Sequence, residues 1–177
     1  MKRQRGFTLV ELMVVVSITV LLMAWAIPSY STWKKKHDIE NQMIQLYSDL
    51  QFGRMTAYGD KVISGVWWGG GTSFTSYQIR SDANNNGVID DTGVDTQIGA
   101  TVTVKNDVGS ITSSAPAGQQ SVSFDGRGFL NTANAPDNNN PITFSVAPSY
   151  GASIDCVMVA TTQIILGKMN AGTCAQK

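Results

Sequence analysis

The chain has 177 residues, of which 42% are hydrophobic and 15% are charged. That length and composition suit one globular domain with its own core and at most one appendage. Its 13 basic and 13 acidic residues balance, but Lys2, Arg3 and Arg5 precede the first apolar run, so the rest carries 10 minus 13, a net charge of −3. A mildly acidic chain has no general attraction to nucleic acid, so such binding would need a local basic patch.

The amino-terminal region contains an apolar segment long enough to cross a bilayer. Residues 12–27 carry no charge, and with residues 7–10 the segment reaches about 21 positions that only Glu11 interrupts. At ~1.5 Å per helical residue it spans ~30 Å, the thickness of the hydrocarbon core. Trp25, Tyr30 and Trp33 then fall where interfacial aromatic residues are expected.

Two export hypotheses fit this segment and predict different mature proteins. A secretory signal peptide would use the basic start, an apolar core over residues 12–22 and cleavage after Ala24-Trp25-Ala26, which would release a soluble protein. Glu11 argues against this hypothesis, because a carboxylate within an apolar helix costs ~2.5 to 3.5 kcal/mol at the membrane centre. A disposable signal gains nothing from that cost.

The second hypothesis comes from residues 5–13, Arg-Gly-Phe-Thr-Leu-Val-Glu-Leu-Met, which closely resemble the prepilin signature of the type IV pilin superfamily. The resemblance implies that a prepilin peptidase cleaves between Gly6 and Phe7 and that the new amino terminus at Phe7 is methylated. It also implies that the carboxylate of Glu11 pairs with the amino-terminal amine of a neighbouring subunit in a filament. A charge inside an apolar bundle needs such a partner.

Helical spacing continues beyond Pro28, where these pilins commonly carry a proline that kinks the helix. Apolar residues recur at intervals of 4, 3, 4 and 7 and predict one face of an amphipathic helix: Ile39, Met43, Leu46, Leu50 and Ala57. We therefore expect one bent helix from about Phe7 to about Tyr58, ending near Gly59. The predicted division is a leader over residues 1–6, a transmembrane and assembly half over 7–33, an amphipathic half over 34–59 and a β-rich head over 60–177.

The head is rich in glycine, serine, threonine and asparagine, with short β-prone runs between turn signals. The predicted strands cover residues 62–67, 74–80, 100–104, 121–124, 142–146, 156–160 and 163–166. The predicted fold class is α+β, with a long bent amino-terminal α-helix packed against a small antiparallel β-sheet head, which is the type IV pilin fold. Trp67 and Trp68, followed by three glycines, are expected in a turn where a packing role is favoured over a binding role.

The order of features in the head resembles one branch, the FimT/GspH-like minor pilins and pseudopilins. The similar segments are residues 50–57, the Asp/Asn-rich loop, Val-Ser-Phe-Asp-Gly-Arg-Gly at 122–128 and the tail from Cys156 to Cys174. Some members of that branch bind DNA through a Gly-Arg-x-Arg turn late in the head. Here the stretch reads Thr-Gln-Ile-Ile at 162–165, without the guanidinium groups that would meet phosphate. Nucleic acid is therefore not an expected partner, and Arg127, between two glycines, either contacts an anion or, as we favour, lies in a plain turn.

The two cysteines, Cys156 and Cys174, lie close to the carboxyl terminus of a chain that carries an export signal. A disulfide is expected in an exported protein, and closing a loop of this length would stabilise the tail by roughly 3 kcal/mol. The alternative is two separate buried thiols. A metal site at the cysteines is not expected, because the only histidine, His37, lies far away beside a lysine run.

Residues 82–90 match the first nine positions of a calcium-binding loop. Its oxygen ligands would be the side chains of Asp82, Asn84, Asn86 and Asp90 and the backbone carbonyl of Val88, with Gly87 at the sharp turn. Gly93 stands where such loops carry a bidentate glutamate, and Asp95 is close enough to substitute. A structural calcium ion and an ordinary surface turn of Asn, Asp and Gly fit this run equally well.

Together these features predict a non-enzymatic structural subunit, a minor pilin or pseudopilin of a type IV pilus or of a type II secretion pseudopilus. Its partners would be other pilin or pseudopilin subunits, contacted through the amino-terminal helix, and the prepilin peptidase. It would be anchored in the bacterial cytoplasmic membrane by a single span with the head outside, and would later lie in the pilus or pseudopilus. The alternatives are a pilus-associated binding module for DNA or a surface ligand, and a soluble exported protein cleaved after Ala26. An enzyme is not expected, since the sequence contains no recognisable catalytic constellation.

Overall fold

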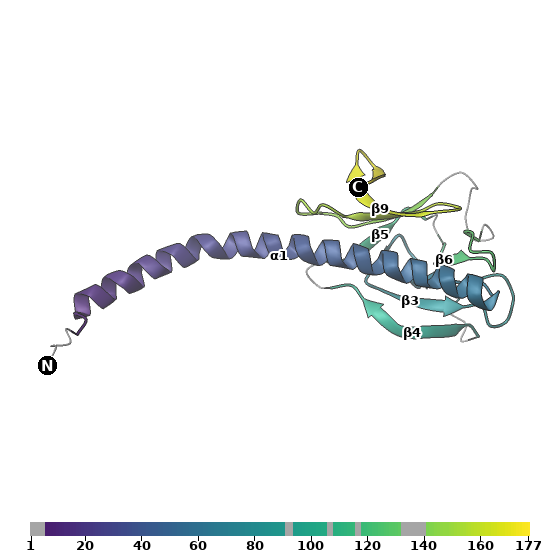
Figure 1. Ribbon diagram of the computed structural model, residues 1–177, viewed down its shortest axis with the longest axis horizontal. Coiled ribbons are helices and arrows are strands. Elements are labelled where there is room, and N and C mark those ends of the chain that lie inside the picture. Colours follow the sequence, from purple (N-terminus) through teal and green to yellow (C-terminus); the bar gives the residue numbers. More distant parts are fainter. Residues whose placement is uncertain (1–5, 91–93, 106–107, 116–117, 132–140) are drawn as a thin grey trace. The chain divides into compact units, whose positions relative to one another are not determined.

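The computed structural model describes residues 6–90, 94–105, 108–115, 118–131 and 141–177. Within these residues the chain forms one long helix, α1 (Leu9–Asp60), followed by ten short strands (Figure 1). It divides into two compact parts, Met1–Lys35 and Lys36–Lys177. The α+β class predicted from the sequence is therefore confirmed.

The bounds of α1 lie two residues from the predicted ones at each end, because the helix starts at Leu9 instead of Phe7 and ends at Asp60 instead of Tyr58. The backbone stays helical through Pro28. A proline removes one amide donor from the helix, and an apolar helix tolerates that loss where neighbouring groups compensate. The bend at Pro28 stays a prediction.

The second half of α1 buries one face in the core of the head, as the spacing predicts. The five residues of that face are fully buried: Ile39, Met43, Leu46, Leu50 and Ala57. Gly53 lies between the last two of them and lets strand β1 (Ser64–Trp67) come close, since a Cβ there would lie 3.2 Å from the Cα of Gly65. Gly65 itself has no room for a side chain, because a Cβ would overlap the carbonyl oxygen of Val122. Gly53 therefore allows the helix to approach β1 closely, and Gly65 allows β1 to lie close to strand β6 (Ser121–Phe124).

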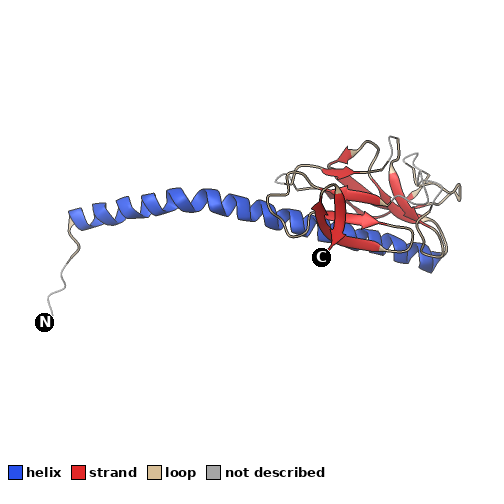
Figure 2. Cartoon of the chain, turned by 90° about the horizontal axis from the view of Figure 1, so that it is seen from above, coloured by secondary structure: helices blue, strands red, loops and turns tan. Residues whose placement is uncertain are grey.

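The strands form two antiparallel sheets, where the sequence predicted a single small one (Figures 1 and 2). The first has the order β4 (Thr96–Thr103), β3 (Ser76–Ser81), β1 and β6 (Ser121–Phe124). The second has the order β10 (Thr173–Gln176), β9 (Ile164–Asn170), β8 (Cys156–Val159), β7 (Ile142–Ser145), β5 (Ile111–Ser113) and β2 (Ser73–Phe74).

Each of the seven predicted strands overlaps at least one observed strand, and one of the predicted strands is divided into two. The run 74–80 is divided at Thr75 into β2 and β3, which belong to different sheets. Strands β5 and β10 were not predicted. The first is three residues long and the second reads Thr-Cys-Ala-Gln, so neither contains the apolar run by which a strand is recognised.

Aromatic side chains fill the core of the head. Trp68 stacks on Phe74 with ring centroids 5.5 Å apart and meets Phe144 edge-on at 5.5 Å. Its indole N–H donates to the carbonyl oxygen of Gly71 at 3.0 Å, so its polar group is satisfied. Trp67 lies under the guanidinium of Arg80, 4.2 Å from the ring centroid. Both tryptophans therefore have the packing role expected for them.

One hydrogen bond ties the helix to strand β3 inside this core. The hydroxyl of Tyr77, which is buried, donates to a carboxylate oxygen of Asp49 at 2.7 Å. Burial raises the pKa of Asp49, and the hydrogen bond from Tyr77 lowers it by less, so the net shift is upward. Burial, together with the hydrogen bond and the charge of Asp49, raises the pKa of Tyr77 as well. Asp49 therefore titrates above the ordinary aspartate range.

The substitution Asp49→Asn tests this assignment. A raised folded-state pKa means that the stabilisation is present below the unfolded pKa and is lost as pH rises through the folded one. Asparagine keeps an acceptor for Tyr77 and does not titrate, so the variant should gain stability relative to the parent chain as pH rises from 3 to 7, measured by urea unfolding in detergent. Asp49→Ala, which leaves the buried hydroxyl unpaired, should lose about 1 to 3 kcal/mol. A stability difference between Asp49→Asn and the parent that does not change with pH would contradict the shift.

Candidate functional site

The predicted cleavage position lies just before α1. Gly6, Phe7 and Thr8 precede the helix, Phe7 is 83% exposed, and a Cβ built on Gly6 would meet nothing within 4 Å. Thr8 caps the helix, because its carbonyl oxygen accepts from the amide of Leu12 at 3.2 Å and its Oγ1 accepts from the amide of Glu11 at 3.2 Å. The structure thus separates a short non-helical segment from a capped helix.

Glu11 stands in the first turn of α1, at the position that completes a capping box with Thr8. Only half of that motif is made: Thr8 caps the amide of Glu11, whereas the carboxylate of Glu11 meets no donor among the described residues. A negative charge in the first turn is favoured by the helix macrodipole, by about 0.3 to 1 kcal/mol at an exposed position. The carboxylate is therefore available to a partner outside this chain.

The helix that follows Glu11 presents apolar side chains on all sides. Every large apolar residue from Leu9 to Met23 is more than half exposed, with Val14 the least at 52%. The helix is long and apolar enough to cross a membrane by length and composition, a test that a signal sequence near an amino terminus also passes. Its hydroxyls are satisfied internally, since Ser17 donates to the carbonyl oxygen of Met13 at 2.8 Å and Thr19 to that of Val15 at 2.7 Å. No polar side chain in this stretch other than Glu11 needs an outside partner.

The Asp/Asn-rich loop is organised by two buried carboxylates. The oxygens of Asp82 accept from the amides of Asn86 at 3.2 Å and Gly87 at 2.8 Å. The oxygens of Asp95 accept from the amides of Ala83 at 3.3 Å and Asp90 at 2.8 Å. Asp95 therefore links Ala83 and Asp90 at the two ends of the run, and its predicted role as a calcium ligand stays a prediction.

Three side chains from elsewhere hold the carbonyl groups of the same loop. Asn131 donates to the carbonyl oxygen of Gly87 at 3.0 Å, Ser121 to that of Ile89 at 3.2 Å and Arg80 to that of Asp90 at 2.6 Å. The carbonyl oxygen of Val88, the backbone ligand of the predicted calcium site, is contacted by no donor in the described part of the chain. The loop thus leaves the expected backbone ligand open while its neighbours are engaged.

The oxygen atoms of this loop are of the chemical type that calcium binds. Each carboxylate oxygen of Asp82 and Asp95 accepts one amide and has a second lone pair to offer. The side-chain oxygens of Asn84 and Asn86 are turned onto loop amides, at 2.9 Å and 2.8 Å. Among the described residues no three Asp, Glu, His or Cys side chains converge, so an ion here would depend on amide and carbonyl oxygens. Gly93 lies outside the described residues.

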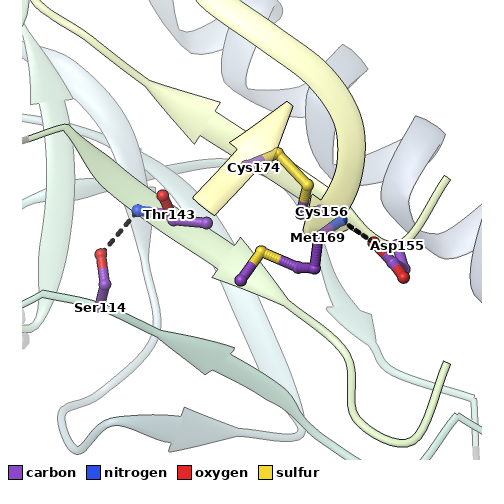
Figure 3. Close-up of a disulfide and its surroundings, with 6 residues drawn as sticks. All are labelled: Ser114, Thr143, Asp155, Cys156, Met169 and Cys174. Carbon is purple, nitrogen blue, oxygen red and sulfur yellow. Dashed lines mark hydrogen bonds between the residues drawn. A yellow bond between two sulfur atoms is a disulfide. The ribbon is translucent and has the colours of Figure 1, made fainter. Parts of the chain in front are cut away.

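The predicted disulfide between Cys156 and Cys174 is present, with the two Cα atoms 6.0 Å apart (Figure 3). It joins β8 to β10 across the intervening strand β9, where Gly167 leaves the space, since a Cβ there would overlap the carbonyl oxygen of Ala175 and lie 3.3 Å from the sulfur of Cys174. Beside it, the buried carboxylate of Asp155 accepts from the amide of Met169 at 2.6 Å. The bridge therefore fastens the terminal hairpin to the second sheet.

Arg127 lies in a turn, as favoured from the sequence, and this turn is built around Asp125. The amides of Arg127 and Phe129 donate to one carboxylate oxygen at 2.9 Å and 3.0 Å, and the guanidinium of Arg127 donates to the other at 2.8 and 3.0 Å. Burial alone would raise the pKa of Asp125, but the amides of Phe129 and Arg127 and the guanidinium outweigh it and lower that pKa.

Sequence reasoning missed Arg54 and Lys61, which reach the same turn from the end of α1. Arg54 donates from Nε to the carbonyl oxygen of Gly128 at 2.7 Å, and Lys61 donates to that of Gly126 at 3.2 Å. The contacts join residues 65 and 74 positions apart, and no local sequence pattern indicates them.

The amino-terminal residues match a known family. Residues 1–27 match the family described as the prokaryotic N-terminal methylation motif. The chain is also 33% identical over 85 residues to the type IV major fimbrial protein FimA of Dichelobacter nodosus, which covers 44% of this chain and 51% of that protein. A second FimA sequence from the same species is 38% identical over 64 residues, covering 32% of this chain and 40% of that protein. The chain thus spans about half the length of the curated relatives it matches.

Among solved structures, the type IV minor pilin FimU of Pseudomonas aeruginosa is similar with a TM-score of 0.48 and 13% identity, covering 76% of this chain and 94% of that one. A similarity at that level carries no argument about function. The match to the methylation motif and the identity to FimA carry the assignment instead. This chain is type IV pilin-like: it has the amino-terminal methylation motif of type IV prepilins and is homologous to FimA pilins over part of its length.

Proposed function

We propose that this chain is a non-enzymatic structural subunit, a minor pilin or pseudopilin, of a type IV pilus or a type II secretion pseudopilus. One observation carries the proposal: the first half of α1 exposes a continuous apolar surface on which Glu11 is the one charged residue up to Met23, and its carboxylate has no partner in the described chain. Such a surface is unstable in water and can be covered by lipid or by other apolar helices. A subunit that moves from a membrane into a filament needs both kinds of surroundings in turn.

The mature chain would begin at Phe7, after cleavage by a prepilin peptidase behind Gly6 and methylation of the new amine. The match of residues 1–27 to the methylation motif supports this cleavage over one after Ala26. So does the local structure, because residues 6–8 lie outside the helix whereas Ala26 lies within it, where backbone groups are hydrogen-bonded and a peptidase would first have to unwind them. The head would then remain outside the cytoplasmic membrane on a single-pass anchor.

In the filament, the carboxylate of Glu11 would pair with the amino-terminal amine of a neighbouring subunit. The amine of Phe7 would stand four residues before the carboxylate, so pairing would fix the axial offset between adjacent helices. Burying both charges together avoids the several kcal/mol that each would cost alone in apolar surroundings. Binding by the head is compatible with this assembly role, because the two functions use different residues.

The substitution Glu11→Gln tests the proposal. The variant should be made, cleaved and held in the membrane like the parent chain, but its amount in sheared filaments should fall at least about tenfold, since removing one member of a buried ion pair costs about 3 to 5 kcal/mol. The amounts in membrane and filament fractions are compared by immunoblot.

Asp60→Asn is the matched control, because Asp60 is exposed at the far end of the same helix and the exchange is also of an acid for its amide. It should assemble normally. Equal amounts of the Glu11→Gln and Asp60→Asn variants in the filament fraction would contradict the proposed role of Glu11.

We also propose that the loop over residues 82–95 holds a structural calcium ion, with oxygen ligands from Asp82, Asn84, Asn86, Asp90 and Asp95 and from the carbonyl of Val88. The open carbonyl of Val88 and the spare lone pairs of the two buried carboxylates support the proposal. A bound ion would relieve the repulsion between carboxylates gathered in one loop. Its purpose would be to stabilise the head.

Calcium should therefore raise the unfolding temperature of the detergent-solubilised chain relative to EDTA, whereas magnesium should not. An ion at about 100 times its dissociation constant adds about 2.7 kcal/mol. Asn84→Ala, which removes one exposed ligand and leaves both buried carboxylates in place, should weaken calcium binding by calorimetry. Identical melting curves in calcium and EDTA would rule the ion out.

A further inference from the structure

A groove of about 430 Å³ lies between the last turns of α1 and the turn that follows β6. The helix contributes Gln51, Arg54, Met55 and Tyr58, and the turn contributes Arg127 and Gly128. The four helix residues are spaced at i, i+3, i+4 and i+7, so they form one stripe along the helix. No part of the assembly role described above uses this groove.

The two arginines of the groove are held in place by hydrogen bonds, and each has further N–H groups that could bind a ligand. Arg54 is fixed by the bond from its Nε to the carbonyl oxygen of Gly128, and its two terminal nitrogens meet no acceptor among the described residues. Arg127 donates hydrogen bonds from Nε and Nη2 to Asp125, and its Nη1 is left as a donor for a ligand. A guanidinium stays charged at any relevant pH and presents its donors in a rigid fork that suits oxyanions.

The charge at this place is out of balance. Lys61 adds a third cation, with its ammonium 3.8 Å from the centroid of the Tyr58 ring. Among the described residues Asp125 pairs with Arg127, and no acid forms an ion pair with Arg54 or Lys61, in a chain whose net charge is zero. The carboxyl end of α1 opposes an anion with a partial charge of only about −0.5. The groove therefore favours a doubly charged anion.

Beside the donors lies an exposed apolar wall. Met55 is 69% exposed and Tyr58 is 60% exposed, although both are large side chains on a helix whose other face is buried. A flat apolar group could cover both while a neighbouring oxyanion meets the guanidinium groups. We propose that this groove binds a phosphate monoester, with its phosphate against Arg54 and Arg127 and its apolar group against Met55 and Tyr58. A carboxylate carries one negative charge, and a phosphodiester carries one negative charge on each phosphate. Neither group therefore offers the two negative charges of a phosphate monoester.

The test uses the full-length chain in detergent and phenyl phosphate as the probe, by calorimetry at pH 7.5 and low salt. We expect saturable binding at one site, about tenfold weaker in Arg127→Gln, since hydrogen bonds to charged groups are the stronger ones. Arg127 is the informative position because its side chain is 79% exposed and the variant should fold. Lys168→Gln, an exposed cation on β9, is the control and should bind like the parent chain.

Two further measurements separate the parts of the ligand. Tyr58→Ala should weaken phenyl phosphate and leave inorganic phosphate unchanged, and benzoate should bind at least about tenfold more weakly than phenyl phosphate. Affinity should also fall at pH 5.5, because a phosphate monoester loses its second charge with a pKa of about 6. The lowered pKa of Asp125 keeps that carboxylate ionised over the interval, so the change reports on the ligand. Absence of saturable binding, equal loss in Lys168→Gln, or equal affinity for benzoate would overturn the proposal.

Discussion

Water is a poor solvent for the first half of α1, and this constraint shapes the rest of the molecule. Large apolar side chains from Leu9 to Met23 are all more than half exposed, and Glu11 stands near the start of that surface without a partner in the described chain. Covering this surface with lipid or with other apolar helices would remove it from water. In contrast, the second half of the same helix buries Ile39, Met43, Leu46 and Leu50 in its own head. One continuous helix thus exposes apolar side chains at one end, which we propose to pack on other subunits, and buries apolar side chains in its own head at the other.

Local patterns in the sequence were sufficient to predict the helix and most of the strands. The 3.6-residue spacing from Ile39 to Ala57 predicted the buried face residue by residue, because one helix packs one stripe on its core. The division into two sheets could not be predicted from the sequence, because it depends on Thr75 ending one strand and on pairings such as β5 with β7 that join distant segments. The close approach of Gly53 and Gly65 could not be predicted either, because it depends on how the helix and a strand pack together.

The same distinction holds for the functional residues. Gly6, Phe7 and Glu11 belong to a contiguous signature, so the sequence alone was enough to propose their roles, and the match to the methylation motif covers the same stretch. Cys156 and Cys174 are the two cysteines of a chain that is expected to be exported, so their pairing could be predicted without a structure. Arg54 lies on α1 and Lys61 directly follows it, and both contact a turn more than 60 residues later in the chain. Charges that converge through the fold leave no local trace in the sequence.

The central claim is that the amino-terminal helix is retained in the mature protein and is the element that polymerises. Intact-mass and amino-terminal analysis of the chain purified from the membrane tests it directly. The account predicts a mature chain that begins with a methylated Phe7 and keeps all of α1, so that the apolar surface and Glu11 remain together. A mature chain that begins at Ile27 would contradict it, because the protein would then have lost both the anchor and the acid through which it is proposed to assemble.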